Sequence, residues 1–229
     1  MSKQVTAILC AGADHPALHL IPTLISDSTD VIYVGIDRGA LGLVRAGYPL
    51  TYALGDFDSV TDQEFEEIEV HSQETYRVQA EKDDTDTELA FEWVQSHYPQ
   101  ATVYLFGAMG ASMIRLDHKI SNIYLAYQPR FSEIILRTTL IEDNLRIRWY
   151  GPGQHQLKAG HSLPDYLSII SMTPVKGLAI QGAKYNLPPT DISYPRAYVS
   201  NEFVSNQDEV ILSVEEGLLM VQWVDERSI

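Results

Sequence analysis

The sequence predicts two domains of different class, an α/β domain with a Rossmann-like parallel sheet followed by an all-β sandwich domain. In the first half, short apolar runs end in turns rich in Gly, Ala and Asp, as buried strands do; they span 5–9, 31–36, 50–54 and 101–106. Segments with helical spacing lie between some of these runs, and strands that alternate with helices favour a parallel sheet with covered faces. In the second half, shorter runs separated by Gly, Pro, Asn and Asp are typical of an antiparallel sandwich.

The expected elements follow from the spacing of apolar residues in chain order. Helices are expected over 41–45, 85–94 and 116–127. Later strands are expected over 134–136, 145–149, 166–171, 198–203, 210–214 and 218–224. The three-residue loop Glu215-Glu216-Gly217 predicts that the last two strands form a hairpin. We expect the boundary near 138–143, which gives domains 1–138 and 139–229.

The composition is that of a globular protein and narrows the classes of partner. The chain has 229 residues and a formal net charge of −15. Because such a surface repels phosphate backbones and anionic lipid, we expect neither nucleic acid nor a membrane as a partner. Nothing resembles a signal peptide or an 18-residue apolar span, and the single Cys10 excludes an intramolecular disulfide. These features predict a cytoplasmic protein.

Acidic residues follow two expected strands, at the edge where parallel sheets bind their ligands. Asp37 follows one strand, and Asp56 and Asp58 lie in the turn Gly55-Asp-Phe-Asp-Ser59 after the next. Carboxylates two positions apart in an extended turn point the same way and can share one cation. Mg²⁺ is the expected cation, since it takes oxygen ligands from one or two carboxylates and from substrate phosphates. Read alone, the turn could be a polar surface turn, but the three carboxylates converge at neighbouring strand ends.

A second acidic stretch, Lys82-Asp-Asp-Thr-Asp-Thr-Glu88, opens the second expected helix. Thr85 and Glu88 have the spacing of a capping box, and acidic residues suit the positive end of a helix dipole. Helix capping alone would explain this stretch, without any ligand. The functional interpretation adds that Asp86, in the first turn, becomes another metal ligand beside amides that can bind phosphate. No G-x-x-x-x-G-K-[ST] is present, so any nucleotide is not held by a P-loop.

The third expected helix begins at Arg115-Leu-Asp-His118. Arg115 can pair with a phosphate there, and Asp117 can accept a hydrogen bond from an amine or hydroxyl of a ligand. An ordinary solvated ion pair at a helix entrance is the alternative interpretation.

Five stretches of the chain, taken in order, resemble the thiamine pyrophosphokinase family of bacterial type. They are Asp37-Arg-Gly-Ala40, Gly55-Asp-Phe-Asp-Ser59, Lys82-Asp-Asp-Thr-Asp-Thr-Glu88, Gly107-Ala108 with Arg115-Leu-Asp-His118, and Ser200-Asn-Glu-Phe203. The resemblance covers nearly the whole chain, and the ordered set is far more specific than any member. It implies transfer of the pyrophosphoryl group of ATP to the hydroxyl of thiamine, giving thiamine diphosphate and AMP.

The resemblance also implies roles for individual residues and an assembly. Mg²⁺ would be held by Asp37, Asp56, Asp58 and Asp86. ATP would contact Arg38, Lys82, Thr85 and Arg115. Thiamine would contact Asp117, Ser200 and Asn201. The catalytic set would be Asp56, Asp58, Asp86 and Asp117. A second subunit's sandwich would complete the thiamine site, so a homodimer with composite active sites is expected.

One departure from the family pattern leaves the placement of Arg115 open. The family usually has a tight Gly-Gly-Arg, where this chain has the longer Gly110-Ala-Ser-Met-Ile-Arg115. Two alternatives stand beside this function. Another Mg²⁺-dependent phosphoryl or nucleotidyl transferase would use the same carboxylates, and a non-catalytic sensor of thiamine or nucleotide would have lost turnover through the altered loop.

Overall fold

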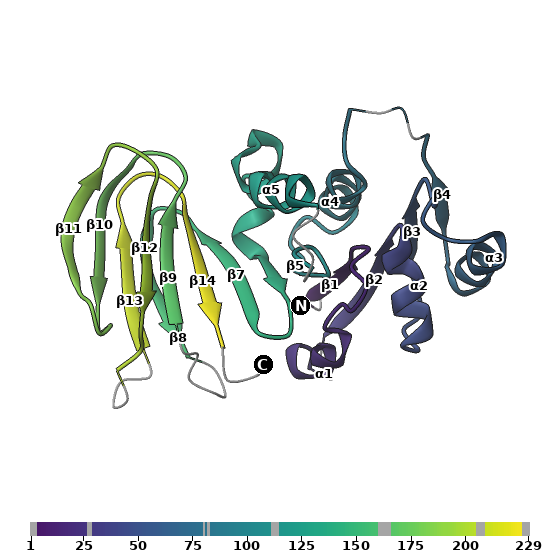
Figure 1. Cartoon of the computed structure of the whole chain (residues 1–229), viewed down its shortest axis with the longest axis horizontal. Helices are drawn as coiled ribbons and strands as arrows, with labels where there is room; N and C mark the ends of the chain where they lie inside the picture. Colours follow the sequence, from purple (N-terminus) through teal and green to yellow (C-terminus); the bar gives the residue numbers. More distant parts are fainter. Residues whose placement is uncertain are drawn as a thin grey trace. The chain divides into compact units, whose positions relative to one another are not determined.

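The structure is a computed structural model that describes residues 4–26, 29–79, 81, 83–110, 115–159, 166–204 and 209–225. The chain divides into two units, Met1–Asp143 and Asn144–Ile229, and Figure 1 shows the elements of each. The sequence predicts the domain boundary near 138–143, and the first unit ends at Asp143.

Six parallel strands form the sheet of the first unit. They are β1 (Val5–Cys10), β2 (Asp30–Ile36), β3 (Tyr52–Gly55), β4 (Thr75–Arg77), β5 (Thr102–Phe106) and β6 (Thr138–Ile141). Their order is β6-β5-β1-β2-β3-β4, and every neighbouring pair is parallel. The central strands read as continuous apolar runs because both faces of the sheet are covered, so their side chains are buried on either side.

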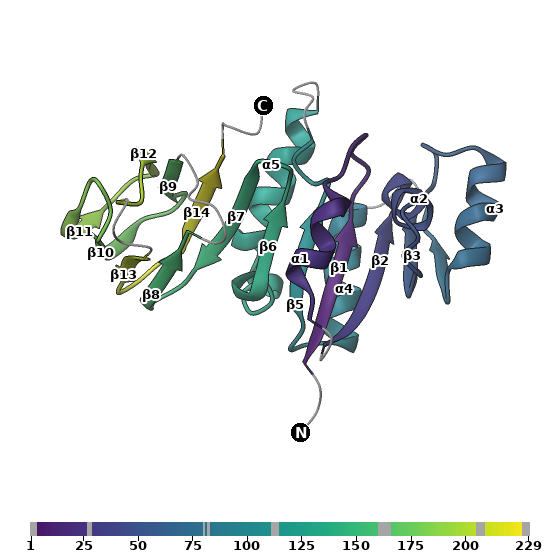
Figure 2. The ribbon, with the colours of Figure 1, turned by 90° about the horizontal axis from the view of Figure 1, so that it is seen from below.

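Helices cover both faces of this sheet. They are α1 (Ile21–Leu24), α2 (Arg38–Arg45), α3 (Asp62–His71), α4 (Asp86–His97) and α5 (Leu116–Tyr124), with short 3-10 helices η1 (Leu18–Leu20), η2 (Leu125–Tyr127), η3 (Pro129–Phe131) and η4 (Ile135–Arg137). Helices α1 and α2 lie on one face, and α4 and α5 lie on the other (Figures 1 and 2). A buried cluster that includes Ile8 of β1, Leu41 and Leu43 of α2 and Ile68 of α3 packs these elements together.

The direction in which the strands are added reverses beside β1. The chain runs outward from β1 to β4 and then returns to place β5 on the other side of β1. The amide of Ala11 donates to the Phe106 carbonyl at 2.9 Å, which ties the two strand ends together. Such a reversal leaves a crevice beyond the carboxyl ends of the strands, where α/β folds bind ligands.

Two antiparallel sheets form the second unit. The strands are β7 (Leu145–Tyr150), β8 (Gly153–Lys158), β9 (Tyr166–Ser171), β10 (Val175–Gln181), β11 (Leu187–Ile192), β12 (Arg196–Asn201), β13 (Glu209–Val214) and β14 (Leu219–Val224). One sheet has the order β7-β14-β9-β12 and the other β11-β10-β13-β8. Inward-facing residues of both sheets, such as Leu167, Leu178 and Leu212, form one core.

The predicted fold class is confirmed, but two local predictions are wrong. The expected hairpin over 210–224 does not form, because β13 and β14 belong to different sheets. The expected strand at 134–136 falls on η4, and the strand that pairs with β5 is β6, which begins at Thr138. Helices α1 and α3 and strands β4, β8, β10 and β11 had not been predicted.

One further property of the fold concerns helix length. In the part of the chain that the structure describes, no helix is both long and apolar enough to span a bilayer.

Candidate active site

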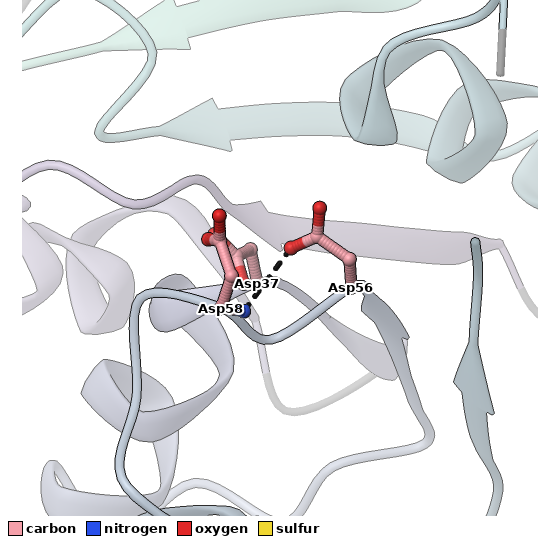
Figure 3. A group of neighbouring side chains, drawn as sticks. All are labelled: Asp37, Asp56 and Asp58. Carbon is pink, nitrogen blue, oxygen red and sulfur yellow. Dashed lines mark hydrogen bonds between the residues drawn. The ribbon is translucent and has the colours of Figure 1, made fainter. Parts of the chain in front are cut away.

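Three carboxylates gather at the carboxyl ends of β2 and β3. Asp37 follows β2, and Asp56 and Asp58 follow β3. One ligand oxygen from each lies within 4.8 Å of the others. Figure 3 shows that all three side chains project to the same side of these turns. The structure therefore brings together three of the four residues that the sequence predicted as metal ligands.

The Asp37 turn is fixed by its neighbours on the next strand. The amide of Asp37 donates to the Leu54 carbonyl at 2.8 Å, and the Ser59 hydroxyl donates to Asp37 Oδ2 at 2.9 Å. A Cβ atom at Gly55 would lie 2.9 Å from the Asp37 Cα, so only glycine allows the two turns to approach this closely. Asp37 itself has a positive φ of 50°. Its carboxylate is thus held at a set position beside the β3 turn.

The Asp56–Asp58 turn is anchored by a buried aromatic residue between the two carboxylates. Phe57 has a φ of 58°, is 2% exposed and packs on Phe65 with the ring centroids 4.9 Å apart. The Asp58 amide donates to Asp56 Oδ1 at 3.1 Å. Arg77 lies over the same Phe65 ring and donates through Nε to the Asp56 carbonyl at 3.3 Å. With Phe57 directed inward, both aspartates are left facing outward.

The electrostatics of the cluster favour a bound cation. Burial raises the pKa of Asp37, the Ser59 hydrogen bond opposes this, and the charges of Asp56, Asp86 and Asp58 raise the pKa further. Asp37 Oδ1 is buried and accepts no hydrogen bond from the described residues. A buried acceptor without a donor and clustered negative charge are both relieved by a hard divalent cation. The donor set therefore fits the metal that the sequence predicted.

The first turn of α4 borders this cluster. Asp86 is the first residue of the helix, and its charge acts on Asp37, so it lies on the same side of the unit. The predicted capping box is present: the Glu88 amide donates to Thr85 Oγ1 at 3.2 Å, and the Thr85 amide donates to Glu88 Oε2 at 2.6 Å. Lys82 lies outside the described residues.

Two further predicted phosphate ligands lie at helix starts. Arg38 is exposed in the first turn of α2, directly after Asp37. Arg115 precedes α5 and donates through Nε and Nη2 to the two carboxylate oxygens of Asp117, at 3.3 Å each. Arg115 also contacts the His118 ring. Both Arg115 and Asp117 are exposed, and residues 111–114 of the altered loop lie outside the described residues.

The two predicted thiamine residues in the second unit differ in environment. Ser200 is exposed and has a φ of 54°. Asn201 is 3% exposed, and its side-chain amide pairs with the backbone: Oδ1 accepts from the Tyr185 amide at 2.9 Å, and Nδ2 donates to the Tyr185 carbonyl at 2.8 Å. The geometry leaves Ser200 open to a ligand, while Asn201 shapes the turn around Tyr185.

Sequence reasoning missed Glu142, which holds the turn after β5. Glu142 Oε1 accepts hydrogen bonds from the amides of Met109 and Gly110 at 2.7 and 3.3 Å. Lys119 and Asn122 of α5 donate to the carbonyls of Gly110 and Ala108, both at 2.8 Å. Burial raises the pKa of Glu142, and the two amide hydrogen bonds oppose that rise. Its position directly after β6 was the available signal, but the sequence predicts a strand at 134–136 and not over β6.

An α/β unit with carboxylates at adjacent parallel strand ends, beside a helix N-terminus, suits an enzyme that transfers phosphoryl groups with the help of a metal. Comparison with known proteins agrees with this class. The family model of the thiamin pyrophosphokinase catalytic domain matches residues 24–137, and that of the thiamin pyrophosphokinase vitamin B1 binding domain matches residues 154–219.

Individual relatives extend over nearly the whole chain. Thiamine pyrophosphokinase of Bacillus subtilis (strain 168) is 31% identical over 206 residues, which are 89% of this chain and 92% of that protein. The crystal structure of a thiamin pyrophosphokinase family protein from Enterococcus faecalis has a TM-score of 0.84 at 32% identity, covering 96% of this chain and 99% of that one. For the Bacillus subtilis thiamine pyrophosphokinase structure the TM-score is 0.79 at 26% identity, with coverage of 96% and 99%. The chain belongs to the thiamine pyrophosphokinase family, which confirms the resemblance seen in the sequence.

Proposed function

We propose that this chain transfers the pyrophosphoryl group of ATP to the hydroxyl of thiamine, giving thiamine diphosphate and AMP. The observation that carries the proposal in this chain is the cluster of Asp37, Asp56 and Asp58 at the strand ends of the unit that matches the catalytic family model. The match of the second unit to a vitamin B1 binding model favours thiamine over another acceptor alcohol. It also disfavours a general nucleotidyl transferase.

We propose Mg²⁺ as the metal, held by Asp37, Asp56 and Asp58 with Asp86 beside them. The buried Oδ1 of Asp37 and the three convergent carboxylates support this assignment. When bound, such an ion neutralises charge on phosphate oxygens and helps to orient them. Ca²⁺ also takes oxygen ligands, but Mg²⁺ is the ion that carboxylates usually bind together with nucleotide phosphates.

The chain's own residues would position the two substrates. Arg38 and Arg115, with Lys82, would neutralise phosphate oxygens, and the Thr85 end of α4 would present backbone amides to them. Asp117 would accept a hydrogen bond from the aminopyrimidine of thiamine. Because Arg115 and Asp117 pair with each other, ligand binding must share or replace that pair. The hydroxyl oxygen would attack the β-phosphorus in line and lose its proton, and AMP would leave as the bond from the β-phosphorus to the bridging oxygen breaks, so no covalent enzyme intermediate is needed.

The thiamine site would be shared between the two subunits of a homodimer, and Ser200 would line it. We also propose a cytoplasmic location, since ATP is the phosphoryl donor and the single Cys10 is a buried free thiol.

A direct assay tests the proposal. Purified chain is incubated with ATP, thiamine and Mg²⁺, and AMP and thiamine diphosphate are quantified by chromatography. We expect the two products in equal amounts, with none when thiamine is omitted or a chelator is added. AMP formation without thiamine would indicate another acceptor. Binding of ATP and thiamine without turnover would indicate a sensor.

A further inference from the structure

A single arginine, Arg130 in η3, ties together the segment that enters α4 and the first two turns of that helix. Its Nη1 and Nη2 donate to the two carboxylate oxygens of Asp84 at 2.9 and 2.6 Å, in the bidentate geometry that arginine favours. Nη1 also donates to Glu92 at 2.7 Å, and Nη2 lies 3.5 Å from Glu88 Oε1. One cation therefore contacts three carboxylates at four-residue spacing.

The arginine is itself held in place from several sides. Its Nε donates to the Gln128 side chain at 2.8 Å, and its carbonyl accepts from Gln95 Nε2 of α4 at 2.9 Å. The guanidinium lies over the Phe131 ring at 4.7 Å. The side chain is 34% exposed, so the contacts are only partly screened by solvent. A fixed, partly buried, bidentate pair differs from a mobile surface ion pair, which contributes little.

The residues that Arg130 contacts surround the start of α4. Asp84 lies two positions before Asp86, and Glu88 lies two positions after it. Glu88, whose side chain is 11% exposed, also closes the capping box with Thr85 and accepts from the Gln128 side chain. Without the guanidinium, three carboxylates would face one another with no cation between them, and their repulsion would act on the first turn of the helix.

We propose that Arg130 is a positioning residue that fixes the first turn of α4 so that Asp86 is presented to the metal and phosphate site. The inference rests on the proposed role of Asp86 as a metal ligand. Arg130 touches neither metal nor substrate in this arrangement; it acts through Asp84 and Glu88. Residues that orient a metal ligand from outside the coordination sphere can change metal affinity by about tenfold or more.

The test measures metal binding directly as well as turnover. Mn²⁺ binding to the ATP-free protein is followed by electron paramagnetic resonance, and Mg²⁺ activation is followed by AMP release. In Arg130→Gln we expect the Mn²⁺ dissociation constant and the half-saturating Mg²⁺ concentration to rise about tenfold, with kcat at saturating Mg²⁺ changed less than about twofold. Amide exchange over 83–89 should become faster, while exchange in β2 and β3 stays as in the wild type. Arg130→Lys keeps the positive charge but loses the planar guanidinium, and its Mn²⁺ dissociation constant should lie between those of the wild type and Arg130→Gln.

Two variants serve as references. Arg45→Gln removes another arginine that pairs with two carboxylates, those of Glu64 and Glu67 at 3.2 and 3.1 Å, at the far end of α2, and should leave metal binding unchanged. Asp86→Asn removes the proposed ligand itself and should weaken Mn²⁺ binding at least as much as Arg130→Gln.

The outcomes separate the inference from the proposed function. If Arg130→Gln binds Mn²⁺ as the wild type does while Asp86→Asn binds it weakly, the positioning role is wrong and the ligand role stands. If Asp86→Asn also binds Mn²⁺ normally, the ligand role fails and the inference fails with it. Should Arg130→Gln not fold, Asp84→Asn serves instead, because it removes only one of the three carboxylates that Arg130 contacts. It is expected to weaken metal binding in the same way while kcat at saturating Mg²⁺ changes little.

Discussion

Backbone strain marks the candidate site residue by residue. Among the described residues, the non-glycine residues with positive φ are Asp37, Phe57 and Ser200. Each such residue costs about 1–3 kcal/mol and persists only when its surroundings hold it. Phe57 is held by its burial against Phe65, and Asp37 by hydrogen bonds to Leu54 and from Ser59. The three strained residues therefore lie at, or directly beside, residues for which we propose ligand contacts.

The first prediction concerns the carboxylates of the β3 turn. Asp58→Asn should lower turnover at saturating substrates by about 100-fold, because a metal contributes several kcal/mol to such transfers. Folding should be retained or slightly improved, because Asn suits a turn and removes one of the clustered charges. Steady-state AMP release and a thermal melt measure the two effects. Full activity at limiting Mg²⁺ would show that Asp58 is not a ligand.

A second prediction concerns the close approach of the two turns at Gly55. A Cβ there would lie 2.9 Å from Asp37 Cα, so Gly55→Ala must push Asp37 away from Asp56 and should abolish most metal-dependent activity. Gly47 also has positive φ, at 85°, but a Cβ there meets nothing within 4 Å. Gly47→Ala should thus cost only about 1 kcal/mol of stability and leave activity intact.

Mn²⁺ binding and thermal melts of the two variants separate the effect of displacing Asp37 from the effect of strain at a positive φ. Equal losses of activity in Gly47→Ala and Gly55→Ala would mean that strain alone is responsible. The contact with Asp37 would then have no special role.

The sequence identifies the carboxylates of the site but not the residues that hold them. Asp37, Asp56 and Asp58 could be predicted because strand ends of a parallel sheet converge. The Ser59 hydrogen bond to Asp37 and the Arg130 contact with Asp84 join positions 22 and 46 residues apart, and nothing in the local pattern encodes them. Such contacts depend on the tertiary packing of loops.

At the scale of elements, turn chemistry predicts the shape of a turn but not the partners of its strands. Gly217 has a positive φ of 106°, as a glycine in a tight loop can, yet β13 and β14 enter different sheets. The backbone of Lys176 instead pairs with Glu215 and Glu216, which directs the chain from one sheet to the other. Helix α3, in contrast, is an element that the sequence did not predict. Its capping box, Thr61 with Glu64, is visible in the sequence, but the helix has too few apolar residues to show helical spacing.

The third prediction concerns Glu142, which joins β6 to the turn after β5. Because burial raises its pKa in the folded protein, its ionisation favours the unfolded state. The stability that the protonated form contributes is complete below the unfolded pKa of about 4.3 and is lost as pH rises through the higher folded pKa. The free energy of unfolding of the wild type should therefore fall relative to that of Glu142→Gln as pH increases from about 4 toward neutrality.

Melting temperatures of both proteins across this pH range measure the effect. Glu142→Ala, which removes the acceptor for the Met109 and Gly110 amides, should be destabilised by about 1–3 kcal/mol at every pH. A difference between wild type and Glu142→Gln that does not vary with pH would contradict the prediction.

At the scale of the whole molecule, the predicted site residues are divided between the two units. The carboxylate cluster lies in Met1–Asp143 and Ser200 lies in Asn144–Ile229. Each unit matches its own family model. A site that needs both units can be built within one chain or between two chains, and two-fold dimers are the commonest oligomers. In a two-fold dimer with shared sites, each subunit would contribute a different unit to each site.

The last prediction tests this sharing by mixing two inactive chains. Asp58→Asn damages the first unit. Ser200→Arg places a bulky cation at the exposed Ser200 of the second unit, where it should block binding of a cationic substrate. Gln154→Arg is the matched control: it places the same side chain at an exposed position of β8 and should leave the enzyme active. If the sites are shared, one site of each mixed dimer carries neither lesion, so an equal mixture after subunit exchange should recover about a quarter of wild-type activity. If each chain builds its own site, every site carries one lesion and the mixture stays inactive. A fully active monomer in sedimentation, or an inactive mixture with exchange shown by mass spectrometry, would rule out the shared site.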